Sequence, residues 1–496
     1  MTEVVRNADV LAGAWRFARA LDRAGVPRRG AVATLVPNGA PALFAYRGAT
    51  WSGRRYTPMS WRWTAEDAAY VAHNCEADAL VAHARFAEAA RAAAAHVAPE
   101  RRFAVGGAIE GFRSFEEALA GERADAYEHP LAGENMLYTS GTTGRPKGVM
   151  REPPPDAPPP TVTCAAGMAM ISAFLPETER SGVHLVAGPL YHSGPNTYCD
   201  GALALGSDVV LMDRFDPEEL LRLVERHRVA STFLVPTHFV RLLRLPADVR
   251  ARYDTSSLRL VCHGAAPVAP DVKRRMIEWW GPVLFEFYGA TEGGGTMIGA
   301  TEWLERPGSV GRPRPGVAMK IVDDDGREVG ARVEGTVCFA LDDGNPFVYK
   351  DDPAKTREGR RGDGWFTTGD IGYVDDDGYL FLCDRSADVV ITGGVNVYPA
   401  QIEAALLELE LVADCCVVGA PNDEWGEEVR AVVQLAPGAD PDTAREAILA
   451  HCRARLSGYQ VPRAVDFDPA LPRTEAGKLA RRGIRARYWQ GRERRI

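Results

Sequence analysis

The chain has 496 residues, of which 46% are apolar and 25% charged, and its formal net charge is −9. This length exceeds what one ordinary core supports, so we expect two or three domains, and the composition permits a large core and does not favour disorder. The acidic balance also argues against a general nucleic-acid binder, which would need a basic surface.

The N-terminal part alternates helical and strand patterns. Apolar residues at helical spacing over residues 10–25 are followed by a short buried strand at 31–37. Further strands are expected at 79–82 and 103–105, with an Ala-rich helix over 86–97 between them. Helices that alternate with short apolar strands predict a layered α/β sheet.

The segment TSGTTGRPKG, residues 139–148, is the most informative motif of the chain. Its glycines let the backbone turn sharply towards an anion, and its hydroxyls and Lys147 supply donors and positive charge. It is not a Walker A loop, because that pattern would require Gly where Pro146 stands. We favour a phosphate-binding loop over the alternative, an ordinary surface turn.

A Pro-rich segment, REPPPDAPPP, follows directly at residues 151–160. It can form neither a helix nor a central strand, because proline lacks the backbone N–H. We interpret it as a rigid exposed excursion, with a lid or a partner motif as the alternative.

The rest of the chain first continues the α/β pattern and then changes. Strands are expected at 183–190, 208–212, 231–236, 258–262 and 283–287. From residue 320 the pattern becomes one of β-hairpins with Asp-Asp-Gly turns, and after residue 396 it returns to α/β. These changes predict a large N-terminal domain and a small C-terminal one, with a boundary near residues 384–388.

Cysteine use and the termini bear on location. The nine cysteines include no C-x-x-C pair, so they are interpreted as buried thiols in a reducing compartment. The N-terminus lacks a signal-peptide pattern, and no run reaches the roughly 18 apolar residues of a spanning helix. We therefore expect a cytoplasmic protein. The Arg-rich residues 480–496 are interpreted as a solvated helix face, with phosphate or partner contact as the alternative.

Six further motifs each give a weak signal alone. Small residues in HGAAPVAP would let a flat base lie against the backbone, and in FYGATEGGG Tyr288 offers an aromatic face and Glu292 a carboxylate for magnesium. Asp370 of TTGD could accept two ribose hydroxyls, and Lys478 follows a flexible glycine. The motifs stand in this order: HGAAPVAP (263–270), FYGATEGGG (287–295), TTGD (367–370), DRSAD (384–388), GGVNVYP (393–399) and PRTEAGKLARR (472–482).

Taken together with the phosphate loop, these motifs resemble the AMP-forming adenylate ligases, which include acyl-CoA synthetases, luciferases and nonribosomal adenylation domains. The resemblance runs over about residues 31–489 and is greatest to bacterial acyl-CoA synthetases. It implies an α/β fold: a large N-terminal domain (1–384) of layered α/β sheets plus a β-barrel-like part, a hinge (385–387), and a small mobile α+β C-terminal domain (388–496). The family's charged hinge position is Ala387 here, so the balance between conformers is left open.

The resemblance also implies the reaction and its cofactors. ATP and Mg²⁺ would convert a carboxylic acid into an acyl-adenylate, and CoA would then accept the acyl group. Lys478, Thr291, Glu292 and His192 are the implied catalytic residues, with Lys478 bridging the acid and the α-phosphate, Thr291 touching that phosphate, and Glu292 binding magnesium. The implied ATP-binding residues are Thr139, Ser140, Thr142, Thr143 and Lys147 for the phosphates, Gly264, Ala265, Ala266 and Tyr288 for adenine, and Asp370 and Arg385 for ribose. Gly393 and Gly394 would line the CoA channel.

The acid pocket is where the sequence is least specific. Tyr191-His192 matches the family's aromatic gate, and three consecutive glycines after Glu292 suggest room for an aryl or a medium-to-long acyl acid. The candidate substrate-binding residues are His192, Pro195, Asn196, His238, Gly293 and Gly294.

Two alternatives to a CoA ligase remain. The activated group could pass to a carrier protein or an amine, with a non-carboxylate acid such as nitrite as substrate in some relatives. A non-catalytic nucleotide-binding homologue is the other alternative, which the intact Lys478, Glu292 and phosphate loop disfavour. The expected partners are the acid, ATP and CoA, with no nucleic acid and no membrane span, and a homodimer is left open.

Overall fold

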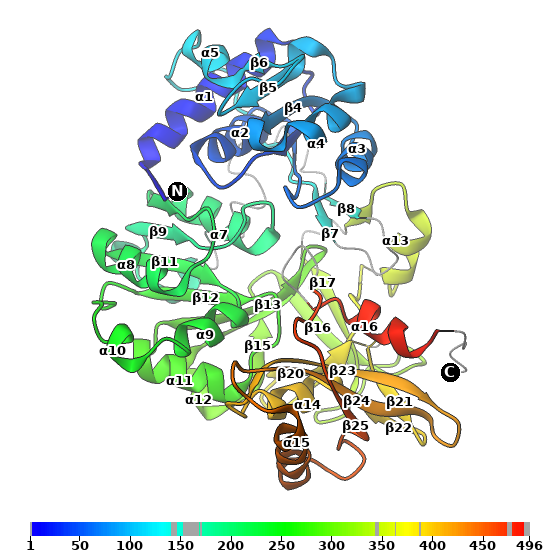
Figure 1. The fold of residues 1–496 in the computed structure, drawn as a ribbon. Coiled ribbons are helices and arrows are strands. Elements are labelled where there is room, and N and C mark those ends of the chain that lie inside the picture. The colour runs from blue at the N-terminus through cyan, green and yellow to red at the C-terminus, as the bar shows by residue number, and fades with distance from the viewer. Residues whose placement is uncertain are drawn as a thin grey trace. The chain divides into compact units, whose positions relative to one another are not determined.

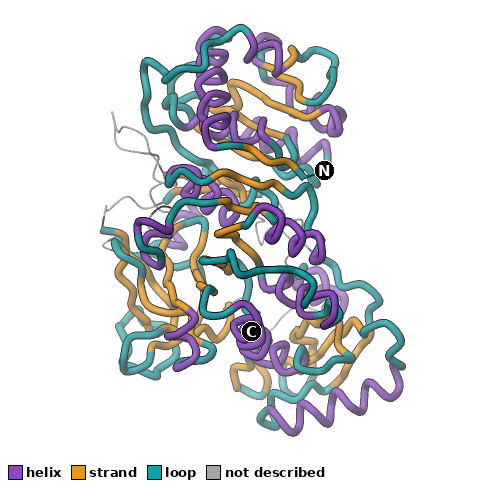
Figure 2. The backbone as a smooth tube through the Cα atoms, turned by 90° about the vertical axis from the view of Figure 1, so that its left-hand side faces the viewer, coloured by secondary structure: helices purple, strands orange, loops and turns teal. Residues whose placement is uncertain are grey.

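The computed structural model describes residues 2–139, 146–151, 168, 171–342, 347–362, 364–385, 388–473 and 479–490 (Figure 1; Figure 2). The chain forms two compact units. The first consists of Met1–Ala265, Met276–Gly293 and Asp343–Glu358, and the second of Ala266–Arg275, Gly294–Asp342 and Gly359–Ile496.

A parallel five-stranded sheet opens the first unit, in the order β3-β2-β4-β5-β6. Alternating residues of its strands face two cores: Val32 and Val81 pack with α1, α2 and α5, whereas Ala33 and Leu80 pack with α3 and α4. The elements are α1 (Asn7–Arg23), β2 (Ala31–Leu35), α2 (Ala40–Thr50), β3 (Arg55–Pro58), α3 (Ala65–Asn74), β4 (Ala77–His83), α4 (Ala87–Ala93), β5 (Arg102–Val105), β6 (Arg113–Ser114) and α5 (Phe115–Ala120). The predicted helix over 86–97 is shorter, because its last turn tightens into a 3₁₀ helix, Ala94–His96, ahead of the extended Ala98 that precedes Pro99.

The second sheet of this unit runs parallel from β10 through β9, β11 and β12 to β13, with β1 antiparallel at its edge. Asp216 caps α8 and Pro217 begins it, with the Asp216 carboxylate accepting from the Glu219 N–H. The elements are β1 (Glu3–Val5), β9 (Val183–Val186), α7 (Ser193–Ala204), β10 (Asp208–Leu211), α8 (Pro217–His227), β11 (Val229–Leu234), α9 (Pro236–Leu243), α10 (Ala247–Arg250), β12 (Leu260–Gly264), α11 (Pro270–Trp280) and β13 (Leu284–Ala290). Parallel strands end at one edge of the sheet, which is where α/β proteins place ligands.

Two strand predictions need correction at this edge. The strand expected over 183–190 ends at Val186, because side chains take over the backbone hydrogen bonds of the following residues. The strand expected over 283–287 instead runs to Ala290 as β13, and the three glycines lie in a further strand, β14 (Gly293–Gly299), so FYGATEGGG is strand, turn and strand.

A small antiparallel sheet flanks the predicted phosphate loop. β7 (Leu137–Thr139) pairs with β8 (Lys147–Met150), and β8 pairs with β18 (Val348–Tyr349), which leads into α13 (Pro353–Gly359). A strand therefore lies on either side of the loop. The loop residues 140–145 and residues 152–160 of the Pro-rich segment lie outside the described residues.

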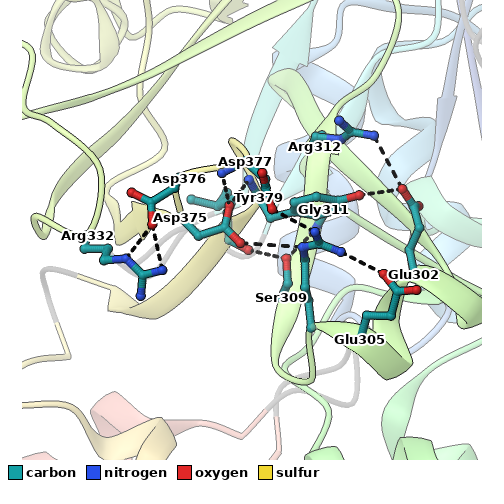
Figure 3. A network of polar contacts seen from close by, with 12 residues as sticks. Glu302, Glu305, Ser309, Gly311, Arg312, Arg332, Asp375, Asp376, Asp377 and Tyr379 are labelled. Carbon is teal, nitrogen blue, oxygen red and sulfur yellow. Dashed lines mark hydrogen bonds and ion pairs between the residues drawn. The ribbon is translucent and has the colours of Figure 1, made fainter.

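Antiparallel strands form the first part of the second unit, in the order β14-β15-β20-β19-β17-β16. The predicted Asp-Asp-Gly hairpin is present: Asp375 accepts from the N–H groups of Asp377 and Tyr379, and Tyr379 donates to Glu302 at 2.6 Å (Figure 3). The further elements are α12 (Ala300–Glu305), β15 (Ser309–Pro313), β16 (Val317–Val322), β17 (Gly335–Leu341), β19 (Asp370–Val374) and β20 (Leu380–Arg385).

The C-terminal part has a sheet in the order β22-β21-β24-β23, with β25 beside β24. Its core consists of buried apolar side chains from strands and helices, among them Val390, Ile402, Val417, Val433 and Ile448. The elements are β21 (Val390–Thr392), β22 (Val395–Val397), α14 (Pro399–Leu406), β23 (Val412–Asn422), β24 (Gly426–Leu435), α15 (Pro441–Arg455), β25 (Ala464–Phe467) and α16 (Arg481–Tyr488).

Arg481 and Arg485 of α16 are not part of the solvated face that the sequence suggested, whereas Arg482 and Arg487 are exposed. Arg481 donates to both carboxylate oxygens of Glu403, at 2.6 and 3.0 Å. Arg485 pairs with the buried Glu427 at 3.0 Å. These ion pairs fasten α16 to its own domain, because bidentate arginine–carboxylate bonds are directional and strong.

Two further expectations can be compared with the structure. Within the described ranges, no helix combines the length and apolar character needed to cross a membrane. The eight cysteines in those ranges are buried thiols, as predicted.

Candidate active site

Lys147, at the start of β8, is held by a carboxylate from a distant part of the chain. Its Nζ lies 3.0 Å from Oδ2 of Asp352. Pairing of β18 with β8, with Tyr349 opposite Val149, brings this carboxylate into reach. The Lys355 backbone N–H, and after it Lys147 itself, holds the pKa of Asp352 below its ordinary value. Asp352 is therefore ionised at neutral pH, and a phosphate would offer Lys147 an equivalent charge-assisted bond.

Glu292 occupies the turn between β13 and β14 and is 9% exposed. Tyr349 donates from its hydroxyl to Oε1 of Glu292 at 2.6 Å. Arg151, which follows β8, donates from its guanidinium to the Glu292 carbonyl oxygen. The structure thus brings the predicted phosphate lysine and the predicted magnesium carboxylate together through one short strand.

The predicted adenine surface begins at the end of β12. Gly264 lies opposite Phe287 on β13, and a Cβ at Gly264 would collide with the Phe287 carbonyl oxygen. Ala265 is exposed and has a φ of 67°, a left-handed conformation that costs a non-glycine residue on the order of 1 kcal/mol. Such strain is commonest at functional sites. Tyr288 is half-buried on the neighbouring strand, and Ala266 is exposed in the second unit.

Two of the glycines after Glu292, Gly293 and Gly294, are closely packed against neighbouring side chains. A Cβ on Gly293 would collide with the Arg151 guanidinium, and one on Gly294 would lie 2.6 Å from the ring of Phe339. The space that was expected to admit a large acid is therefore occupied beside these two residues. Their role in substrate binding stays a prediction.

The predicted gate residues Tyr191 and His192 lie between β9 and α7. Their rings are 4.3 Å apart, and the Tyr191 ring meets Trp61 edge-on at 4.6 Å. His192 is half-buried and precedes the first residue of α7, while Pro195 is buried within that helix.

Two other candidate pocket residues have partners within the protein. Asn196 donates from Nδ2 to the Leu190 carbonyl at 3.1 Å and accepts from Asn135 at the same distance. The His238 ring stacks on Phe215 at 3.8 Å and accepts from the Val235 N–H. Burial lowers the pKa of His238 to about 3, so its ring is neutral.

The predicted ribose residues lie opposite each other in the second unit. Asp370 on β19 pairs in register with Arg385 on β20. Asp370 is 8% exposed, and its Oδ2 accepts from the Thr368 hydroxyl at 2.6 Å. Gly369, with a φ of 83°, makes the turn that ends at this carboxylate.

The predicted CoA-channel glycines form the two-residue turn between β21 and β22. Their φ values are 57° for Gly393 and 80° for Gly394, which is the left-handed conformation that a tight hairpin turn of this length requires. Both are exposed, and a Cβ on either would meet nothing within 4 Å.

Some predicted residues cannot be placed. Ser140, Thr142, Thr143 and Lys478 lie outside the described residues, as do the side chains of Thr139 and Arg385 and the hinge residues 386–387. The described residues hold no group of three or more His, Cys, Asp or Glu side chains arranged for a metal ion. A single carboxylate such as Glu292 still fits Mg²⁺, which usually takes one or two carboxylates and completes its shell with water and substrate phosphates.

Sequence reasoning missed Tyr349, Asp352 and Arg151. Asp352 gives one local signal, because it precedes Pro353 and caps α13 by accepting from the Lys355 N–H at 2.9 Å. Nothing local links it to Lys147, which is 205 residues away.

Comparison with known proteins places this geometry in a family. Residues 8–342 match the AMP-binding enzyme family, and residues 401–478 match the AMP-binding enzyme C-terminal domain. The chain belongs to the AMP-forming adenylate ligases. The mixed α/β fold with a large N-terminal and a smaller C-terminal domain is confirmed with it.

Individual adenylate ligases similar to this chain differ in their named activities. The chain is 30% identical to the medium/long-chain-fatty-acid–CoA ligase FadD8 of Mycobacterium tuberculosis, over 96% of this chain and 84% of the relative. It is 35% identical to a feruloyl-CoA synthase of Amycolatopsis, over 71% and 69%. The amide bond synthetase McbA of Marinactinospora thermotolerans superposes with a TM-score of 0.82 at 30% identity, over 97% and 94%. An adenylate-forming ligase is thus established, whereas its acid and acceptor are not.

Proposed function

We propose that this protein activates a carboxylic acid with ATP and then transfers the acyl group to CoA. The observation that carries the proposal is the connection of Lys147 to Glu292 through β18, Asp352 and Tyr349. Lys147 would bind a phosphate and Glu292 would bind magnesium. A bound substrate could replace the present partner of each, Asp352 for Lys147 and Tyr349 for Glu292.

In the first half-reaction, a carboxylate oxygen of the acid attacks the α-phosphorus of ATP, and the bond to the bridging oxygen breaks to release pyrophosphate. Lys147 would leave Asp352 for the terminal phosphates, while Asp352 keeps the Lys355 N–H. Glu292 would exchange the Tyr349 hydroxyl for Mg²⁺, which neutralises phosphate charge when bound. Thr291 and Lys478 would stabilise the negative charge that develops at the α-phosphate.

In the second half-reaction, the CoA sulfur attacks the acyl carbon, the bond to AMP breaks, and the thiol proton passes to solvent. The Gly393-Gly394 turn would admit the pantetheine arm, because it is exposed and carries no side chain. The rotation of the C-terminal domain about residues 385–387 remains part of this proposal.

The acid is proposed to be an aryl or a medium-to-long acyl acid. The similarity to a feruloyl-CoA synthase and to a medium/long-chain-fatty-acid–CoA ligase supports both classes equally. We also propose a cytoplasmic location, since eight buried thiols suit a reducing compartment.

ATP–pyrophosphate exchange tests the proposal when it is run with acetate, octanoate, palmitate, benzoate and ferulate. We expect acid-dependent exchange with at least one of the larger acids, followed by CoA consumption and AMP release in equal amounts. Lys478→Ala is the matched inactive control. Absence of exchange with every acid would contradict acid activation.

A second candidate function is amide formation, favoured by the similarity to McbA over 97% of this chain. The same assay separates it from CoA ligation. Release of AMP that depends on an added amine and not on CoA would establish this alternative.

A further inference from the structure

The backbone that carries the proposed gate has an unusual support. β9 ends at Val186, so residues 188–192 lie beyond the sheet before α7 begins. Side-chain amides, in place of a neighbouring strand, hold the backbone of Leu190 in this segment. Leu190 directly precedes Tyr191 and His192.

Asn38, which follows β2, holds the segment from one side. Its Oδ1 accepts from the Leu190 N–H at 2.9 Å. Its Nδ2 donates to the carbonyls of Gly188 at 3.0 Å and Met212 at 2.9 Å. These partners fix the orientation of the amide. If the amide were flipped, its NH₂ group would face the Leu190 N–H, and its oxygen would face the Gly188 and Met212 carbonyls.

Asn196 holds the same residue from the other side. Its Nδ2 donates to the Leu190 carbonyl at 3.1 Å, and the residue is 4% exposed. Its Oδ1 accepts from Nδ2 of Asn135 at 3.1 Å. Asn135 lies two residues before β7, the strand that leads into the predicted phosphate loop.

The position of the gate therefore depends on these amides. Both backbone groups of Leu190 are satisfied by side chains, and the Leu190 side chain is 5% exposed. Loss of either amide would leave a buried polar group unpaired, which favours a shift of the segment. Such a shift would move His192 and the Tyr191 ring away from Trp61.

We propose that Asn38 and Asn196 are positioning residues that set the acid pocket by fixing Leu190 and, through it, His192. The proposal rests on the proposed function, in which His192 borders the acid. It predicts that their loss affects recognition of the acid and leaves recognition of ATP nearly unchanged.

The test compares Asn38→Ala with Asn7→Ala. Asn7 is a matched control, because its amide also donates to two carbonyls, those of Leu203 and Ser207, at the opposite end of α7. With the acid that the wild-type enzyme turns over fastest among octanoate, palmitate, benzoate and ferulate, Asn38→Ala should raise the KM for acid at least about fivefold. The KM for ATP should change less than about twofold, and Asn7→Ala should change neither.

Two further measurements separate positioning from general destabilisation. In a His192→Ala background, Asn38→Ala should add almost nothing to the KM for acid, because the residue through which it acts is gone. Hydrogen exchange on the ligand-free protein should speed up in a peptide covering 188–192 in Asn38→Ala, with β11 unchanged. If Asn38→Ala folds poorly, Asn38→Asp replaces it; because a carboxylate oxygen would oppose the Gly188 and Met212 carbonyls, this variant should raise the KM for acid at least as much.

The outcomes distinguish the two proposals. A wild-type enzyme without acid-dependent exchange contradicts the proposed function. If the wild type is active, two results in Asn38→Ala would contradict the positioning role but not the proposed function. One is an unchanged KM for acid, and the other is an equal increase in the KM for acid and the KM for ATP.

Discussion

Lys147 in the first unit and Arg481 on α16 are both cations paired with a carboxylate, yet the two pairs differ in kind. Lys147 meets Asp352 through one Nζ–Oδ2 contact of 3.0 Å. Arg481 makes two bonds to Glu403 and a third to the Val417 carbonyl at 2.6 Å. Although burial alone would lower it, Glu403 raises the pKa of Arg481 well above its ordinary value.

The difference lies in what a ligand could replace. An ammonium group is a point charge that exchanges one oxygen partner for another, whereas a guanidinium fork is matched to a single carboxylate. Breaking the Lys147 pair therefore costs little when phosphate takes the place of Asp352. Breaking the Arg481 pair would strand a largely buried charge. The presence of a charged residue does not by itself indicate a binding site. Whether a ligand can replace the residue's partner in the protein is more informative.

The largest loss of activity is expected at Lys478. This residue lies outside the described residues, and its catalytic role is implied by the resemblance to the family. Lys478→Ala should reduce acyl-adenylate formation by about 100-fold or more, because the lysine stabilises charge only in the transition state. Thioester formation from a supplied adenylate should be largely spared. Pyrophosphate exchange and CoA consumption measure the two steps, and an equal fall in both would overturn the assignment.

Asp370 provides the next largest effect. If it accepts both ribose hydroxyls, Asp370→Ala should weaken ATP binding by roughly 2–4 kcal/mol and abolish discrimination against 2′-deoxy-ATP. Asp376→Ala is the control, because Asp376 is on the same hairpin and forms an exposed pair with Arg332 (Figure 3). A mutant that still prefers ATP would place the ribose elsewhere.

Lys147 and Arg481 can be compared directly. Lys147→Ala should raise the KM for ATP about tenfold with little change in melting temperature, as expected for loss of one charge-assisted bond. Lys350→Ala should affect neither, although Lys350 is as buried as Lys147 and pairs with Glu76 at 3.1 Å. Arg481→Ala should instead destabilise the fold by about 2–4 kcal/mol. A larger stability loss in Lys147→Ala than in Arg481→Ala would contradict the distinction drawn above.

Buried neutral groups should give the most gradual effect. Burial lowers the pKa of His184 to about 3, and its Nδ1 lies 2.9 Å from Ser231 Oγ. Between pH 6.5 and 3 the unfolded chain binds a proton that the folded chain does not, so stability falls as the pH drops below 6.5 and is independent of this group above it. For each such histidine the slope rises from about half of 1.4 kcal/mol per pH unit at pH 6.5 to nearly the full value at pH 5.

His184→Gln should remove the share of this slope that belongs to His184, because glutamine does not titrate. Urea unfolding of the wild type and the variant between about pH 5 and 6.5 measures it, in a range where most carboxylates do not yet titrate. Identical slopes would show that His184 is not the buried neutral group responsible.

The sequence by itself determined the family, the α/β layering and the order of the motifs. Local signals suffice for these, because apolar periodicity and hairpin turns such as the Asp-Asp-Gly turn at residues 376–378 act over a few residues. The opposition of Asp370 and Arg385 also follows from a short antiparallel hairpin.

Only the tertiary structure decided which side chains meet over long separations. The pairing of Tyr349 with Glu292 spans 57 residues, that of Asp352 with Lys147 spans 205, and that of Asn38 with Leu190 spans 152. It also showed that Gly293 and Gly294 face occupied space and that Arg481 and Arg485 of α16 pair with Glu403 and Glu427. Side-chain contacts of this kind depend on how strands and loops are brought together by packing, and no local pattern of residues encodes that arrangement.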